Sequence, residues 1–292
     1  MKLLNVISNG HRRFFSNLTE HQKKLMARGL PKQRDLPGVK KVIAVASGKG
    51  GVGKSTVSCN IAISLANMFN LKVGLLDADI YGPSIPKMMG LADHQPNVND
   101  KKLMIPLKNY NVNCMSMGFL VEEKAALVWR GLMVMNAIER LLFQVDWSSD
   151  GPLDVLVIDM PPGTGDVQLS ISQNLKLNGS VIVTTPQDIA LLDARRAVEM
   201  FNKVNVKTIG LVQNMSFFCC SKCGNKEYIF GRDGAAKLAK EIGCTILEDV
   251  PLNTQIRECC DEGQPITISK PDHKISLIYK DICQKIISDL NI

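Results

Sequence analysis

The hydrophobic positions of this chain form short apolar runs that alternate with longer stretches of helical periodicity. Short apolar runs bounded by polar or glycine residues are typical of buried strands, and apolar positions three and four residues apart are typical of helices. We therefore expect strands at residues 42–46, 72–77, 112–117, 153–159, 180–185, 208–213 and 245–250, and helices at 55–68, 132–145, 189–204, 234–242 and 274–290. This order predicts an α/β fold with a mostly parallel sheet covered by helices on both faces. Without an internal repeat, residues 41–292 are expected to form one domain.

The first apolar run leads into a glycine-rich loop that matches the phosphate-binding pattern G-x-x-x-x-G-K-S/T. Glycines let the backbone curl so that successive N–H groups point at a polyphosphate, at the start of a helix whose dipole favours an anion. Because the motif lies between a predicted strand and a predicted helix, a nucleotide site is favoured over a merely flexible loop. The expected nucleotide contacts are Gly48, Gly50, Gly51, Val52, Gly53, Lys54, Ser55 and Thr56.

Three residues of this loop have distinct expected roles. Lys54 would reach the terminal phosphates, and the Ser55 hydroxyl would ligate Mg²⁺. Lys49 is a second lysine that the ordinary pattern does not require. Its position two residues into the loop directs its cation away from its own phosphates, which raises the question of whose phosphates it serves.

Carboxylates end two further apolar runs. Asp77 and Asp79 follow the second run, and residues two apart on an extended chain face the same way, so together they could serve metal and water. The alternative is a polar exit from a strand. Asp159 ends another run and precedes a loop rich in Pro and Gly, residues 160–166. We expect Asp159 in the Mg²⁺ shell and the loop to respond to a γ-phosphate, so that hydrolysis releases it.

The base of the nucleotide is expected to be adenine. The guanine-reading pattern N-K-x-D is absent, because the similar stretch at residues 202–205 ends in Asn and lies within a predicted helix. Asn214, at the end of a strand, and the turn at Pro251 are the candidate contacts with the base. The sequence therefore favours ATP as the nucleotide.

A cysteine-rich loop, residues 219–223, contains Cys220 and Cys223 in a C-x-x-C pattern with Cys219 beside them. Two thiolates at this spacing can bind one metal or one edge of a cluster, although four ligands are usual. Cys259 and Cys260 could complete the set within one chain, or a second copy of the loop could do so across a two-fold axis. A redox pair or buried thiols are the alternatives. The remaining cysteines fall on apolar patterns and are expected in the core: Cys59, Cys114, Cys244 and Cys283.

The net charge of +7 is concentrated at the N-terminus. Residues 1–41 hold ten Lys and Arg against Glu20 and Asp35, a net charge of +8, which leaves −1 for residues 42–292. A nucleic-acid partner is therefore not expected. The leader at residues 1–40 combines a basic, acid-poor start with a Pro- and Gly-containing linker, which favours a mitochondrial presequence over a solvated tail. No apolar run approaches the ~18 residues of a membrane span, so membrane contact would be peripheral.

Taken together, the segments GKGGVGKS, LLDADIYGPSIPKMMG, DMPPGTGD and the C-x-x-C pair resemble the Mrp/Nbp-type P-loop ATPases that carry iron–sulfur clusters, particularly their mitochondrial branch. The phosphate loop is that of the broader deviant-Walker ATPases. The likeness runs from residue 28 to about residue 269 and includes residues 129–133 and 213–216. The extra thiol of Cys219 is not part of the family pattern, and it leaves open which of the adjacent sulfurs is the ligand.

The resemblance implies an ATP-driven homodimer in which Lys49 enters the partner's active site and Asp79 positions the attacking water. It also implies a labile [4Fe–4S] cluster, bridged by Cys220 and Cys223 of both subunits and delivered to apoproteins of respiratory complex I in the mitochondrial matrix. Slow ATP hydrolysis would act as a conformational switch. The rival hypotheses are a partitioning or positioning ATPase of the same fold and a non-catalytic scaffold stabilised by zinc.

Overall fold

The computed structural model describes residues 33–120 and 131–292, and residues Arg34–Ile292 form a compact unit. Its centre is an eight-stranded sheet with the order β10-β7-β6-β1-β5-β2-β4-β3. All neighbouring strands are parallel except β3, which runs antiparallel to β4. The strands are β1 (Val39–Ala46), β2 (Val73–Asp77), β3 (Leu107–Asn109), β4 (Val112–Ser116), β5 (Leu153–Asp159), β6 (Gly179–Thr184), β7 (Thr208–Gln213) and β10 (Ile246–Asp249). The mostly parallel sheet that the sequence predicts is confirmed.

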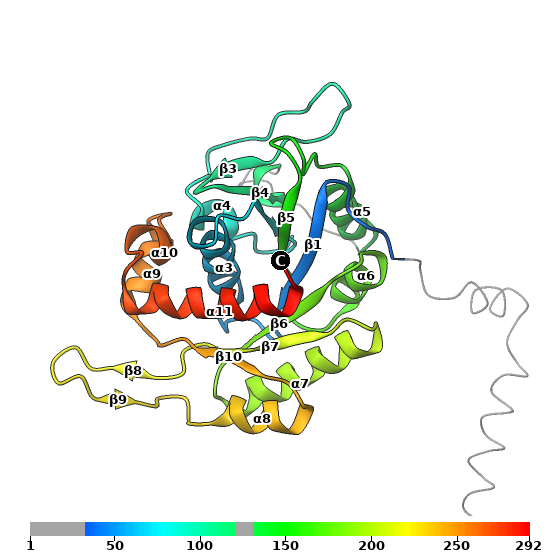
Figure 1. The fold of residues 1–292 in the computed structure, drawn as a ribbon. Helices are drawn as coiled ribbons and strands as arrows, with labels where there is room; N and C mark the ends of the chain where they lie inside the picture. The colour runs from blue at the N-terminus through cyan, green and yellow to red at the C-terminus, as the bar shows by residue number, and fades with distance from the viewer. Residues whose placement is uncertain (1–32, 121–130) are drawn as a thin grey trace, which may run out of the picture. The chain divides into compact units, whose positions relative to one another are not determined.

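Helices cover both faces of this sheet (Figure 1). On one side lie α3 (Lys54–Met68), α4 (Ile85–Met88), α9 (Thr254–Asp261), α10 (Ile266–Ser269) and α11 (Lys274–Leu290). On the other lie α5 (Gly131–Phe143), α6 (Asp166–Asn174), α7 (Asp188–Lys203) and α8 (Gly234–Ile242). A short 3-10 helix, η1 (Met117–Phe119), follows β4, and a hairpin of β8 (Phe218–Cys219) and β9 (Lys226–Glu227) stands apart from the main sheet.

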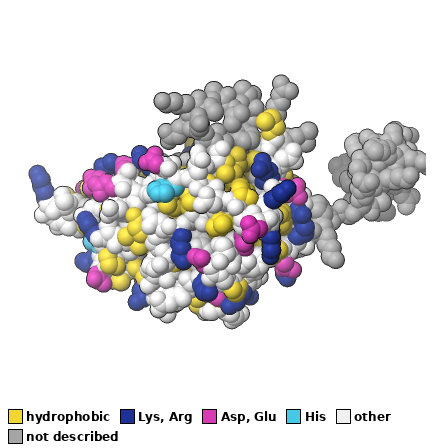
Figure 2. Space-filling view, turned by 90° about the horizontal axis from the view of Figure 1, so that it is seen from above, with side chains coloured by type: hydrophobic (Ala, Val, Ile, Leu, Met, Phe, Trp, Pro, Cys, Tyr) yellow, Lys and Arg dark blue, Asp and Glu magenta, His cyan; other side chains and the backbone are white. Residues whose placement is uncertain are grey.

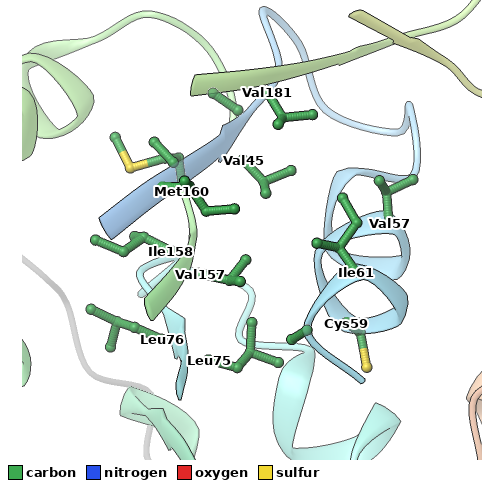
Figure 3. Packing of buried hydrophobic residues seen from close by; sticks show 14 of the residues in the cluster. Val45, Val57, Cys59, Ile61, Leu75, Leu76, Val157, Ile158, Met160 and Val181 are labelled. Atoms are coloured by element: carbon green, nitrogen blue, oxygen red, sulfur yellow. The ribbon is translucent and has the colours of Figure 1, made fainter. Parts of the chain in front are cut away.

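Part of the buried core lies between α3 and the central strands (Figure 3). Val45, Leu75 and Val157, from β1, β2 and β5, face Val57 and Ile61 of α3, and all five side chains are fully buried. Each such aliphatic side chain stabilises the fold by roughly 1.5–3 kcal/mol relative to an exposed position. The helix that follows the phosphate loop is thereby fixed against the sheet, which gives that loop a rigid base.

The element bounds agree closely with the sequence pattern. β5, β7, α8 and α11 occupy the residues expected for them, and β1 begins three residues earlier than expected. The pattern missed the short or polar elements: β3, the hairpin β8–β9, α4, α6, α9 and α10. The leader at residues 1–32 and part of the family-like segment at residues 129–133 lie outside the described residues.

Charges of both signs are mixed over the face shown in Figure 2, where Lys and Arg lie among Asp and Glu. This distribution agrees with the near-neutral balance of residues 42–292. Within the described ranges, no helix combines the length and apolar character needed to cross a membrane.

Candidate nucleotide site and cysteine hairpin

The phosphate loop joins β1 to α3 and depends on two glycines. Gly53 caps α3 with a φ of 83°, a left-handed conformation that favours glycine, and its carbonyl accepts the Val57 N–H. A Cβ at this position would lie 2.2 Å from the Asn214 amide nitrogen. A Cβ on Gly48 would lie 2.0 Å from the carbonyl oxygen of Asp193 in α7. Close packing from both sides thus fixes the path of the loop.

Behind the loop, Lys54 and Asp159 form a buried ion pair. The Lys54 ammonium lies 2.7 Å from Asp159 Oδ1 and 3.1 Å from the Ser55 hydroxyl, and both charged side chains are at most 6% exposed. The Ser58 hydroxyl, one turn further along α3, also donates to Asp159 Oδ1. Among the described residues, Asp159 Oδ2 is buried with no hydrogen-bond partner. Such an atom costs free energy unless a cation or donor meets it, so it points to a ligand.

The loop after β5 lies against the phosphate loop. The Gly163 N–H donates to the Ser47 carbonyl oxygen at 3.2 Å, and the Met160 N–H donates to the Val45 carbonyl oxygen at 3.0 Å. The Gln168 amide donates to the Pro161 carbonyl from the first turns of α6. The stretch expected to sense the γ-phosphate is therefore irregular up to Gly165 and adjacent to the candidate phosphate position.

Asp77 organises the loop between β2 and α4. Its carboxylate accepts the backbone N–H groups of Asp79, Ser84 and Ile85, and also the Ser116 hydroxyl. Burial raises the pKa of Asp77 to about 7, and the nearby charge of Asp159 acts in the same direction. A cation at this position would favour the ionised form. The direct role of Asp77 toward Mg²⁺ stays a prediction.

Asp79 occupies a more open position. Its carboxylate accepts the Gly82 N–H at 3.3 Å, and the side chain is only partly buried. Burial nevertheless raises its pKa, and the Lys54 ammonium partly offsets this. Asp79 is therefore partly open to solvent, and its role in orienting water stays a prediction.

A pocket of about 470 Å³ opens beside the phosphate loop. Its lining includes Gly53 and Thr56 together with Asn214 and Pro251, the two residues expected to contact the base. The Asn214 amide also donates to the Val52 carbonyl oxygen at 2.8 Å. Residues predicted from separate motifs thus lie around one cavity that is large enough for a nucleoside.

Lys49 is half-buried, and its carbonyl oxygen accepts the Ser47 hydroxyl at 2.8 Å. Its ammonium has no ion pair or hydrogen bond with any of the residues that the structure describes. The role of Lys49 toward a phosphate of a partner chain stays a prediction.

The cysteine pair lies at the turn of the β8–β9 hairpin. The Cys220 N–H donates to the Asn225 carbonyl, and the Gly224 N–H returns to the Cys220 carbonyl, both at 2.9 Å. The pKa of Cys220 is lowered, first by the backbone N–H groups of Cys223 and Lys222 and then by the Cys223 side chain. These donors favour the thiolate, which is the form that binds metals.

Cys219 ends β8, and Cys220 is the first residue of the turn. The Cys219 thiol contacts the Gly224 carbonyl oxygen at 3.4 Å, whereas Cys220 interacts with Cys223. The assignment of Cys220 and Cys223 as the ligand pair stays a prediction.

Comparison with known proteins shows the family of this chain. Residues 38–287 match the family model described as "ParA: NUBPL iron-transfer P-loop NTPase". The chain belongs to this family. It is 58% identical over 274 residues to the iron–sulfur cluster transfer protein NUBPL of Mus musculus, which covers 94% of this chain and 85% of the relative. It is 54% identical to an Arabidopsis thaliana iron–sulfur protein required for mitochondrial NADH dehydrogenase, covering 87% and 80% of the two chains.

A solved relative supports the fold of this NUBPL-family chain. The Archaeoglobus fulgidus nucleotide-binding protein, whose structure contains ADP, has a TM-score of 0.70 and 35% sequence identity. The match covers 82% of this chain and 91% of the archaeal chain. The architecture is therefore that of the P-loop NTPases.

The other cysteines of this NUBPL-family chain do not complete the hairpin site. Cys259 and Cys260 are buried in α9, and burial raises the pKa of Cys260 to about 11. Cys59, Cys114 and Cys283 are buried as expected, whereas Cys244 is half-buried. The described part of the chain contains no group of three or more His, Cys, Asp or Glu arranged to hold a metal ion.

Sequence reasoning missed two serines that hold the carboxylates. Ser58 lies four residues after Lys54, hence on the same face of α3, and this spacing was the available signal. Ser116 ends β4 directly beside Asp77 in the parallel register, a pairing that the sequence alone does not reveal.

Proposed function

We propose that this chain is an ATP-binding carrier that holds a [4Fe–4S] cluster between two copies and delivers it to apoproteins of respiratory complex I. The names of the mouse and Arabidopsis relatives support cluster transfer and a link to mitochondrial NADH dehydrogenase. The mitochondrial matrix is the proposed site of action, and residues 1–40 are the proposed presequence and linker, because their composition suits import.

The observation that carries this proposal is the pair of accessible thiols at Cys220 and Cys223. Cys223 is exposed, Cys220 is half-buried, and backbone donors favour the Cys220 thiolate. A [4Fe–4S] cluster usually takes four thiolates, and a two-fold axis through two hairpins would supply them. Ligation by a shared, exposed set makes the cluster a cargo that can be handed on.

The nucleotide would bind along the phosphate loop, with its base in the pocket beside Asn214 and Pro251. Mg²⁺ fits the oxygen donors present, since Ser55 offers a hydroxyl and Asp159 an unpartnered buried oxygen. When bound, the ion would neutralise developing charge on the phosphates. Lys54 would hold the terminal phosphates, and the ammonium of Lys49 would reach those of the partner. Asp79 would orient the attacking water, so that slow hydrolysis resets the dimer.

Anaerobic reconstitution followed by iron and sulfide analysis tests the cargo. The wild type should take up about four iron and four sulfide per dimer. Cys220→Ala/Cys223→Ala should lose the cluster, whereas the matched variant Cys219→Ala should keep it. Full cluster retention in the double variant would overturn the assignment, and stoichiometric zinc that survives chelation would favour a zinc-stabilised scaffold.

A further inference from the structure

The pocket beside the phosphate loop and the cysteine hairpin share one wall. Asn214, which lines the pocket, lies six positions before Cys220, and the intervening residues form the root of the hairpin. Pro251 and Leu252 line the same pocket from a separate segment. These two short segments are hydrogen-bonded to each other, so the pocket and the hairpin are built from the same pieces of backbone.

The first segment is held against the phosphate loop. The Asn214 side chain donates to the Val52 carbonyl oxygen at 2.8 Å and packs against Gly53. The next residue, Met215, has a φ of 54°, a left-handed conformation that is unusual for a long side chain. Met215 also lines the pocket. Strain at this point persists only because its neighbours fix it, and such strain is concentrated at functional positions.

The second segment is bonded to the hairpin root. The Leu252 N–H donates to the Phe217 carbonyl oxygen at 2.8 Å, and Phe218 and Leu252 form a parallel bridge. The Ser216 N–H and hydroxyl both donate to the Val250 carbonyl oxygen, at 3.0 and 3.1 Å. The root is therefore fixed by the chain that forms the opposite side of the pocket.

Contacts continue from the root into the hairpin. The Lys226 ammonium lies 4.5 Å from the centre of the Phe217 ring, and the Tyr228 ring lies 6.3 Å from it. Phe217 thus connects the outgoing and returning strands. The chain that follows β9 packs against another element, because a Cβ on Gly234 would lie 2.8 Å from the Pro186 carbonyl oxygen, near the start of α7. Among the described contacts, β8 and the residues just before it are the part of the hairpin that is hydrogen-bonded to the segment lining the pocket.

We propose that nucleotide in the pocket positions the Cys220–Cys223 hairpin through Met215 and the Leu252–Phe217 hydrogen bond. A base bound between Asn214 and Pro251 stabilises the arrangement of both segments by its binding free energy. Because these segments form the root of the hairpin, the hairpin is positioned as well. Met215 and Leu252 are positioning residues in this inference. It rests on the proposed function in treating the hairpin thiols as the cluster ligands.

The test measures how fast iodoacetamide modifies Cys220 and Cys223 in the cluster-free protein, by peptide mass spectrometry. The protein is kept dilute enough to remain monomeric by light scattering, so that shielding by a partner does not contribute. Saturating ADP should change the wild-type rate at least about threefold. Calorimetry confirms that ADP is bound in every arm.

Leu252→Pro removes the N–H donor, so it should bind ADP yet lose the rate change. Leu252→Ile retains the donor and should respond like the wild type. Met215→Gly accepts the left-handed conformation without strain and lacks the side chain in the pocket, so it should also lose the rate change. This variant decides the outcome if Leu252→Pro fails to fold.

An unchanged wild-type rate with ADP bound would overturn the proposal, as would a full response in a folded Leu252→Pro or, failing that variant, in Met215→Gly. The result is separable from the cluster assignment. A rate change together with cluster retention in Cys220→Ala/Cys223→Ala would support the coupling while refuting Cys220 and Cys223 as the cluster ligands.

Discussion

At the scale of single residues, the Lys54–Asp159 ion pair links the phosphate loop to the end of β5. Two opposite charges at 2.7 Å are buried behind the phosphate loop. Such a pair is costly to break from one side, because the remaining charge is left in a medium of low dielectric constant. If nucleotide and Mg²⁺ bind as proposed, they would give each of the two charges a new partner.

Lys54→Met should therefore lower the free energy of unfolding of the nucleotide-free protein by about 3–5 kcal/mol, since it isolates the Asp159 carboxylate. Lys54→Met/Asp159→Asn should recover most of this loss, because neither charge remains. Neither variant should hydrolyse ATP. Denaturant unfolding and an ATPase assay measure the two effects, and equal stability of Lys54→Met and the wild type would contradict the role of the pair.

The thiols should differ sharply in their pH dependence. A lowered pKa gives Cys220 more thiolate at neutral pH, so its alkylation should reach a plateau at a lower pH than an ordinary thiol. Burial raises the pKa of Cys260 to about 11, and this thiol should remain unmodified near pH 8. The Glu227 carboxylate opposes the Cys220 thiolate, so Glu227→Gln should shift the Cys220 profile to still lower pH.

Mass spectrometry of alkylated peptides between about pH 6 and 9 tests these expectations. Glu241→Gln in α8 removes a carboxylate that is paired with Arg195 instead, and it serves as the control. A Cys220 profile that does not differ from that of a model thiol would contradict the hairpin geometry.

At the scale of elements, the turn from β1 into α3 depends on what surrounds each glycine. Gly51 and Gly53 both have φ near 80°, yet a Cβ on Gly51 would meet nothing within 4 Å. Gly51→Ala should cost about 1 kcal/mol of stability from backbone strain alone. Gly53→Ala should cost more, because it also displaces the Asn214 amide from the Val52 carbonyl.

Thermal and denaturant unfolding without nucleotide compare the two variants directly. Nucleotide titration should show that Gly53→Ala also weakens binding, since Asn214 lines the base pocket. Equal stability losses in the two alanine variants would show that Asn214 does not constrain the loop.

The elements that could be predicted are those whose own residues determine them. The apolar runs of β5 and β7 and the helical periodicity of α11 predict the bounds of these elements, because their apolar side chains are the ones buried in the core. β8 and β9 contain two residues each and are largely exposed, so they depend on a turn and on Leu252 for their order. Similarly, Ser58 and Asp159 are 101 residues apart, and only the folded sheet brings them together.

At the scale of the whole molecule, the ammonium of Lys49, which has no ion pair or hydrogen bond with the residues that the structure describes, leads us to expect an assembly. We expect Mg·ATP to shift the chain from monomer to dimer, measured by light scattering after size-exclusion chromatography. Lys49→Ala should weaken this dimer and lower the ATPase rate while leaving ATP binding to the monomer intact. Lys41→Ala removes a lysine from within β1 and serves as the control. An unaltered dimer in Lys49→Ala would exclude a role for Lys49 across the interface.

The two edges of the sheet constrain how such a dimer can form. At one edge, β10 has four residues with a register shift, and the Lys285 ammonium donates to the Leu247 carbonyl there. At the other, β3 has three residues and reverses direction. Short, irregular or capped edges resist extension by another chain. Two subunits would therefore meet without sharing strands, and they could separate after each round of hydrolysis with every strand pairing intact.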